Sequence, residues 1–181
     1  MSPTDDVKWL APQTKRLALD SVGSWNRREI SGQTEAGLPP ATHTHTTENH
    51  MKVLIACEYS GAVRDAFRDR GHDAMSCDLL PTDKPGPHYE GDVTDIINDG
   101  WDMLIAFPPC THLAVSGARW FPEKRADGRQ QAALDFVRLL MDAPINKIAI
   151  ENPVSVISSH IRKPDQTIKP WQVGHGETKS K

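Results

Sequence analysis

Short apolar runs alternate with amphipathic and polar stretches along the chain from residue 52 onward. A continuous apolar run that ends in turn residues is typical of a strand buried on both faces of a sheet. By this pattern we predict strands over residues 52–57, 73–77, 88–93, 101–107 and 145–150. Two intervening stretches are predicted to be helices, residues 62–70 with Gly71 at the C-terminal cap, and residues 129–142. The longer helix places these apolar residues on or beside one face: Ala133, Leu134, Val137, Leu140 and Met141.

Strands that alternate with helices predict an α/β fold, in which a doubly wound, mostly parallel sheet is joined by right-handed crossovers. In such sheets ligands bind beyond the carboxyl ends of the strands. Polar or reactive residues follow the end of each predicted strand, so we expect them on one rim of the sheet. In chain order they are Glu58 with Tyr59, Ser60 and Gly61; Asp78; Asp92; Pro108, Pro109 and Cys110; and Glu151 with Asn152.

The chain divides near residue 50. Residues 1–50 are poor in apolar residues, show no long periodic stretch and end in a Thr- and His-rich run. We interpret them as a weakly ordered extension without a catalytic part, and residues 51–181 as the catalytic domain. The cluster of His43, His45 and His50 is interpreted as a solvated linker rather than a metal site, because no cysteine accompanies it.

Composition narrows the class of protein. The net charge of −3 excludes a protein that is basic throughout, although it leaves room for a local basic patch. The three cysteines form no CxxC pair, which argues against a zinc ribbon, and their odd number in a reducing compartment argues against a disulfide scaffold. No apolar run approaches the length of a membrane span or reads as a signal peptide, so we expect a cytoplasmic protein, monomeric by default and without a metal.

Three motifs on the predicted rim suggest chemistry. Glu58 to Gly61 link a strand to a helix, where a glycine lets the backbone approach a ligand, and Asp78 suits a ribose diol. Two prolines hold Cys110 at the rim, where it would act as a nucleophile if a neighbour such as His112 or Arg119 favoured its thiolate. Glu151 is placed to hydrogen-bond or protonate a ring nitrogen.

Residues 111–128 resemble a long loop, with Gly117, Pro122 and Gly128 as turn residues. Basic and aromatic side chains interleave there and just beyond, a composition that suits the phosphates and bases of nucleic acid. These residues are Arg119, Trp120, Phe121, Lys124, Arg125 and Arg129. The tail over residues 160–181 is also basic.

Taken together, these motifs resemble the DNA cytosine-5 methyltransferases, especially their short phage-type members, over about residues 51–179. The sequence from Phe107 to Cys110 resembles the nucleophile motif of the family, and Glu151-Asn152-Pro153 its Glu-Asn-Val motif. Ser116-Gly117 and Gly128-Arg129 resemble its mobile catalytic loop, and Tyr59-Ser60-Gly61 the start of its cofactor motif.

The resemblance implies a Rossmann-like class I methyltransferase fold, incomplete at the C-terminus, that uses S-adenosylmethionine. Cys110 would attack C6 of a flipped cytosine, and Glu151 would engage N3 with Asn152 orienting it. The residues implied in cofactor binding are Glu58, Tyr59, Ser60, Gly61, Asp78, Asp92 and Pro108. Those implied in DNA binding are Ser116, Arg119, Lys124, Arg125, Arg129 and Lys179.

The sequence departs from the family pattern in several places. Pro153 replaces the family's valine, and neither a second cofactor-loop glycine nor the C-terminal cofactor and target-recognition motifs are evident. A non-catalytic binding module of the same fold therefore stays as an alternative. A methyltransferase acting on an amino group is a weaker alternative, because Phe107 offers no acceptor before the prolines.

Overall fold

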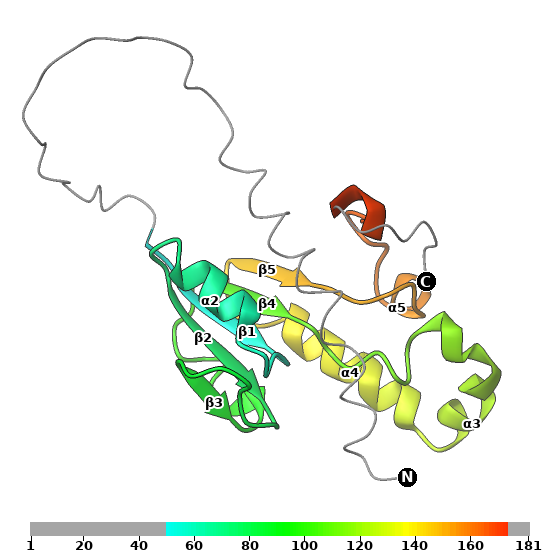
Figure 1. Ribbon diagram of the computed structural model, residues 1–181. Helices are drawn as coiled ribbons and strands as arrows, with labels where there is room; N and C mark the ends of the chain where they lie inside the picture. Colours follow the sequence, from blue (N-terminus) through cyan, green and yellow to red (C-terminus); the bar gives the residue numbers. More distant parts are fainter. Residues whose placement is uncertain (1–49, 174–181) are drawn as a thin grey trace, which may run out of the picture.

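The computed structural model describes residues 50–173, so the predictions for residues 1–49 and for Lys179 lie outside it. Within this range five strands form one sheet in the order β3-β2-β1-β4-β5, and every neighbouring pair is parallel. The strands are β1 (Lys52–Ala56), β2 (Asp73–Asp78), β3 (His88–Glu90), β4 (Met103–Ala106) and β5 (Lys147–Ile150). The predicted α/β fold with a parallel sheet is confirmed (Figure 1).

Helices cover both faces of this sheet (Figure 1). The helix α2 (Ala62–Arg68) packs on one face, and α4 (Arg129–Met141) packs with the 3-10 helix η2 (Val93–Asp95) on the other. Four further elements lie beyond the strand ends: η3 (Val115–Trp120), α3 (Phe121–Ala126), α5 (Ile157–His160) and η4 (Pro170–Val173).

The central strand β1 explains why the sequence begins its regular pattern with a continuous apolar run. Val53 and Ile55 pack with Phe67 of α2, whereas Leu54 packs on the opposite face in the core that includes Leu140 of α4. All four residues from Val53 to Ala56 are fully buried. Because full burial of one large aliphatic side chain stabilises a fold by about 1.5–3 kcal/mol, β1 anchors both halves of the core.

The prediction of a long loop over residues 111–128 is wrong. The 3-10 helix η3 and the helix α3 occupy most of this stretch and lead directly into α4. Pro122 lies in the first turn of α3, where its missing N–H costs nothing, and Gly128 joins α3 to α4 with a left-handed φ of 83°. Phe121 is buried, which fixes this helical segment to the body of the protein.

Other boundaries shift by a few residues. The helix predicted over residues 62–70 ends at Arg68, and Gly71 follows with a φ of 85°. The sequence predicts a strand over residues 88–93, but β3 covers only the first half of that range, His88–Glu90. Asp92 lies outside that strand, because its side chain caps the following 3-10 helix.

Backbone hydrogen bonds align the carboxyl ends of the strands into one rim. Gly91 N–H donates to Asp78 O (2.9 Å), and Glu58 N–H donates to Cys77 O (3.1 Å). Across the sheet, Phe107 N–H donates to Ala56 O and Glu151 N–H to Ala106 O, both at 3.0 Å. The residues expected at the strand ends therefore lie along one rim. The order in which strands are added to the sheet reverses at β1: β2 and β3 lie on one side of it, and β4 and β5 on the other. This reversal is the position at which open parallel sheets bind ligands.

Candidate active site

The turn from β1 into α2 is held by the side chain of Glu58. Its carboxylate accepts hydrogen bonds from the N–H groups of Gly61 (3.1 Å) and Ala62 (3.3 Å) and from the hydroxyl of Ser60. Glu58 and Ser60 are both buried. Since the Glu58 carboxylate is engaged by the turn itself, its role is to shape the backbone from Tyr59 to Gly61.

Two backbone conformations make this turn possible. Cys57 has a φ of 58°, a left-handed value uncommon for a residue with a side chain, and it bends the chain directly after β1. Gly61 has a φ of 69° and packs against the guanidinium of Arg64, so that an added Cβ would collide with it. The glycine is therefore required for two reasons, its conformation and this close contact.

Asp78, the last residue of β2, and Asp92, which follows β3, lie on the same side of the site. Asp78 Oδ1 accepts from Leu80 N–H (3.0 Å), and burial raises the pKa of this carboxyl against the opposing effects of that hydrogen bond and of His88. Asp92 Oδ1 accepts from the N–H (2.9 Å) and the hydroxyl (2.8 Å) of Thr94, which lowers its pKa. We call Glu58, Asp78 and Asp92 the acidic half of the site.

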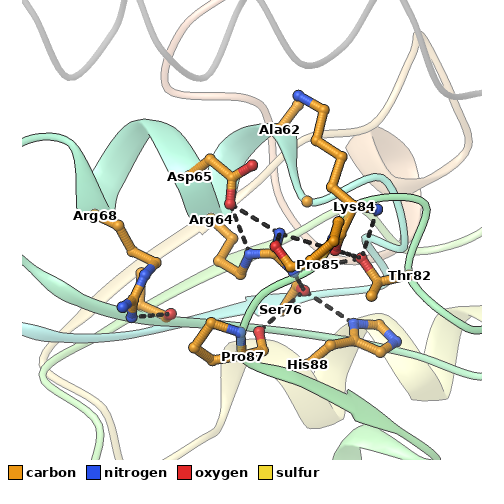
Figure 2. A network of polar contacts seen from close by, with 12 residues as sticks. Ala62, Arg64, Asp65, Arg68, Ser76, Thr82, Lys84, Pro85, Pro87 and His88 are labelled. Carbon is orange, nitrogen blue, oxygen red and sulfur yellow. Dashed lines mark hydrogen bonds and ion pairs between the residues drawn. The ribbon is translucent and has the colours of Figure 1, made fainter.

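A buried arginine ties the loop after β2 to this half (Figure 2). The guanidinium of Arg64, fully buried on α2, donates to Thr82 Oγ1 (3.3 Å) and to the carbonyls of Lys84 and Pro85 (3.2 Å each). It also pairs with Asp65 at 2.8 Å. A further bond from Asp83 N–H to Tyr59 O (2.9 Å) joins the same loop to the β1–α2 turn. Sequence patterns gave no sign of this network, because its partners lie up to 21 positions apart.

Cys110 lies across the reversal point, on the loop after β4. Its carbonyl accepts from Leu113 N–H (2.9 Å) and Ala114 N–H (2.8 Å), which fixes a turn at the thiol. The residue before the second proline is fixed as well, because Asn152 Nδ2 donates to Pro108 O at 3.1 Å. The two motifs that follow β4 and β5 are thus in direct contact.

The three thiols differ in their surroundings. Burial, with the nearby charge of Asp78, raises the pKa of Cys57 far above its usual range, and it raises that of Cys77 to about 12. Burial and the charge of Glu151 also raise the pKa of Cys110, whereas a backbone hydrogen bond and the charge of Lys124 lower it. Among the described residues, a nearby cation favours the thiolate of Cys110 but not those of Cys57 and Cys77. That cation is Lys124, whereas the sequence suggested His112 or Arg119.

Glu151 has the properties of a proton donor. It follows β5 directly, is partly buried, and its burial raises its pKa from 4.5 to about 7. Its charge raises the pKa of the Cys110 thiol, which follows the neighbouring strand β4. We call Cys110, Glu151 and Asn152 the thiol half of the site.

The predicted basic surface is only partly present. Lys124 is buried at 8% exposure, which does not fit a DNA contact, and Arg129 is paired with Glu123 and Asp127 at 2.7 Å each. Ser116, Arg119 and Arg125 are exposed, and Arg119 stacks on the Trp120 ring with 4.9 Å between its guanidinium carbon and the ring centroid.

Residues 50–173 contain neither a candidate membrane span nor a candidate metal site. No helix in this range is long and apolar enough to cross a membrane, and no group of His, Cys, Asp or Glu side chains is arranged to hold a metal ion. Comparison of the chain with protein-family models, with curated proteins and with solved structures finds no match. The case for a function therefore rests on the geometry of the site.

Proposed function

We propose that this chain transfers a methyl group from S-adenosylmethionine to C5 of cytosine in DNA, through a covalent adduct with Cys110. The observation that carries the proposal is the pair formed by Cys110 and Glu151 at neighbouring strand ends. A thiol and a carboxyl whose pKa lies near 7 are the two groups needed to add a nucleophile to a pyrimidine while its ring nitrogen is protonated.

The acidic half fits the cofactor by the chemistry of its donors and acceptors. A carboxylate accepts about four hydrogen bonds, so Asp78 can hold Leu80 N–H and a ribose diol together. Exposed Asp92 offers a further acceptor, and buried Pro108, in the loop after β4, would add an apolar contact. When bound, S-adenosylmethionine supplies the activated methyl group. Asp78 and the 59–61 backbone would bind and orient it at the reversal point between β1 and β4.

The thiol half would act on the base. Cys110 Sγ, after losing its proton to solvent, forms a bond to C6 while protonated Glu151 donates to N3, and the electron pair of the C5–C6 double bond becomes available at C5. Once C5 carries the methyl group, solvent would take the C5 proton and N3 would return its proton to Glu151, so that the Sγ–C6 bond breaks, the thiolate leaves and the C5–C6 double bond returns. Asn152, which bonds to Pro108 O, would hold the two loops in register.

The test is transfer of labelled methyl from S-adenosylmethionine to mixed-sequence DNA, followed by digestion to nucleosides. The proposal expects label in 5-methylcytosine and none when Cys110 is replaced by serine. Label in N4-methylcytosine or N6-methyladenine would contradict the role of Cys110. Label on free dCMP but not on DNA would make the protein a modifier of nucleotides.

One observation favours a second candidate, a non-catalytic binding module of the same fold. Burial and Glu151 hold the pKa of the Cys110 thiol above its usual value, so the resting site does not favour the nucleophile. This candidate predicts cofactor binding without methyl transfer to any acceptor.

A further inference from the structure

The side chain of Lys124 is buried beside the turn that carries Cys110. It comes from α3, is only 8% exposed, and its Nζ donates to the carbonyl oxygen of Thr111 at 2.5 Å. Thr111 directly follows Cys110. Gly117 of η3 lies close by, since a Cβ added there would be 3.6 Å from Lys124 Nζ. The ammonium is therefore enclosed between α3, η3 and the turn after Cys110.

This placement is costly for a structural lysine. An ammonium carries three N–H donors, and among the described residues Thr111 O is the hydrogen-bond acceptor recorded for it. Burying a charge without a partner of opposite sign is unfavourable, and a neutral side chain would fill the same space at lower cost. Within residues 50–173 no salt bridge is formed by Lys124, so the charge at this point favours an anion such as a thiolate.

We propose that Lys124 is a positioning residue for Cys110, whose ammonium stabilises the Cys110 thiolate and holds the turn from which the thiolate attacks. This inference rests on the proposed function for its biological purpose, but not for its test. The chemical step is the loss of the Sγ proton to solvent, which leaves the thiolate next to a fixed positive charge.

The charges that act on Cys110 support this role. Lys124 lowers the pKa of the thiol, whereas burial and Glu151, which follows β5, raise it. Because the pKa of Glu151 lies near 7, protonation of Glu151 near neutral pH removes its opposing charge, so that burial alone then opposes the effect of Lys124 on the thiol. A thiolate, a protonated Glu151 and a charged Lys124 form the combination that the proposed reaction needs.

The experiment measures alkylation of Cys110 by iodoacetamide in the full chain between about pH 6 and pH 10, resolved by mass spectrometry of its peptide. Lys124→Gln keeps a hydrogen-bond donor for Thr111 O but removes the charge, and Lys124→Arg keeps both. Lys147→Met is the control, because it removes an exposed lysine from the amino end of β5, whereas Cys110 lies beyond the carboxyl end of the neighbouring strand β4. Protection of buried Cys77 from the same reagent reports whether each variant is folded.

We expect Lys124→Gln to slow alkylation at about pH 8 roughly three- to tenfold, the effect of one screened charge at close range, and to move the midpoint to higher pH. Lys124→Arg and Lys147→Met should follow the wild-type curve within about twofold. A folded Lys124→Gln variant with the wild-type curve would overturn the proposal, since the donor alone would then suffice. If Lys124→Gln does not fold, loss of the wild-type curve in folded Lys124→Arg would overturn it instead.

The measurement uses neither cofactor nor DNA, so its failure is distinguishable from failure of the proposed function. A wild-type protein that transfers no methyl group but shows the Lys124-dependent curve would refute the methyltransferase and keep the inference. If Lys124→Gln transfers methyl groups as the wild type does and its alkylation curve is unchanged, the inference about Lys124 is refuted and the methyltransferase is kept.

Discussion

Replacing Glu151 by glutamine should stabilise the fold at neutral and alkaline pH while removing most of the activity. Glutamine has nearly the same shape as glutamate but carries no charge at any pH. The carboxylate of Glu151 is held in a partly buried position after β5, and this burial is the cause that raises its pKa. The substitution removes the buried charge without removing the side chain.

The size of the effect follows from the pKa. It rises from 4.5 in an unperturbed glutamate to about 7 in the folded protein. At about 1.4 kcal/mol for each pKa unit, ionising Glu151 costs the folded state about 3 kcal/mol more than the unfolded chain. The folded state binds the proton more tightly, so the stability from this group is fully present below about pH 4.5 and is lost as the pH rises through about 7.

The assay is urea unfolding of the wild type and of Glu151→Gln at about pH 4 and about pH 8. The difference in free energy of unfolding should shift by about 3 kcal/mol in favour of the variant between these two conditions. Any pH-independent effect of the amide cancels in this comparison. A difference that stays the same at both pH values would refute the idea that Glu151 is buried as a neutral acid. In parallel, methyl transfer should fall in kcat with little change in DNA affinity, because glutamine cannot give N3 a proton.

Three further predictions follow from the same structure. Cys110→Ser should abolish methyl transfer but leave the Kd for S-adenosylmethionine unchanged in calorimetry; transfer that survives would exclude the covalent step. Asp78→Asn should weaken that Kd about tenfold or more, the scale of one charged hydrogen bond, whereas an unchanged Kd would place the ribose elsewhere. Arg64→Met should lower the free energy of unfolding in urea by about 3 kcal/mol, because three hydrogen bonds from the buried guanidinium to the loop after β2 are lost at about 1 kcal/mol each, and a change below about 1 kcal/mol would contradict the role of this network.

Much of the fold could be predicted from sequence because its signals are local. The apolar run of β1 is continuous since both of its faces are covered, and the amphipathic pattern of α4 reflects its one-sided packing. The rim of the site was also predictable, since parallel strands must end at the same edge. Residues 111–128 were misread because Pro122 and Gly128 indicate turns in isolation, whereas the structure uses one to start a helix and the other to link two helices.

The finer features of the site depend on contacts that no local pattern records. Glu58 bonds to the turn because Cys57 adopts a left-handed conformation, which a sequence does not reveal. Lys124 resembles a surface lysine by composition, but buried Phe121 fixes α3 so that this side chain points inward. Lys124 therefore lies beside the turn of Cys110 rather than on the basic surface predicted for residues 111–129.

The two halves of the site are supported by separate networks, and this separation bears on how the chemistry would be assembled. Arg64 fixes the loop beside Asp78 from α2, on the side of β2 and β3. Lys124 fixes the turn beside Cys110 from α3, on the side of β4 and β5. The main connection between the halves is β1 itself, whose backbone bonds to Phe107 and, through Glu58, to Cys77. Because a strand buried from Val53 to Ala56 deforms little, the proposed function would let each half hold its own ligand while the distance between the two ligands stays fixed. A fixed distance is what a direct transfer between two bound groups requires.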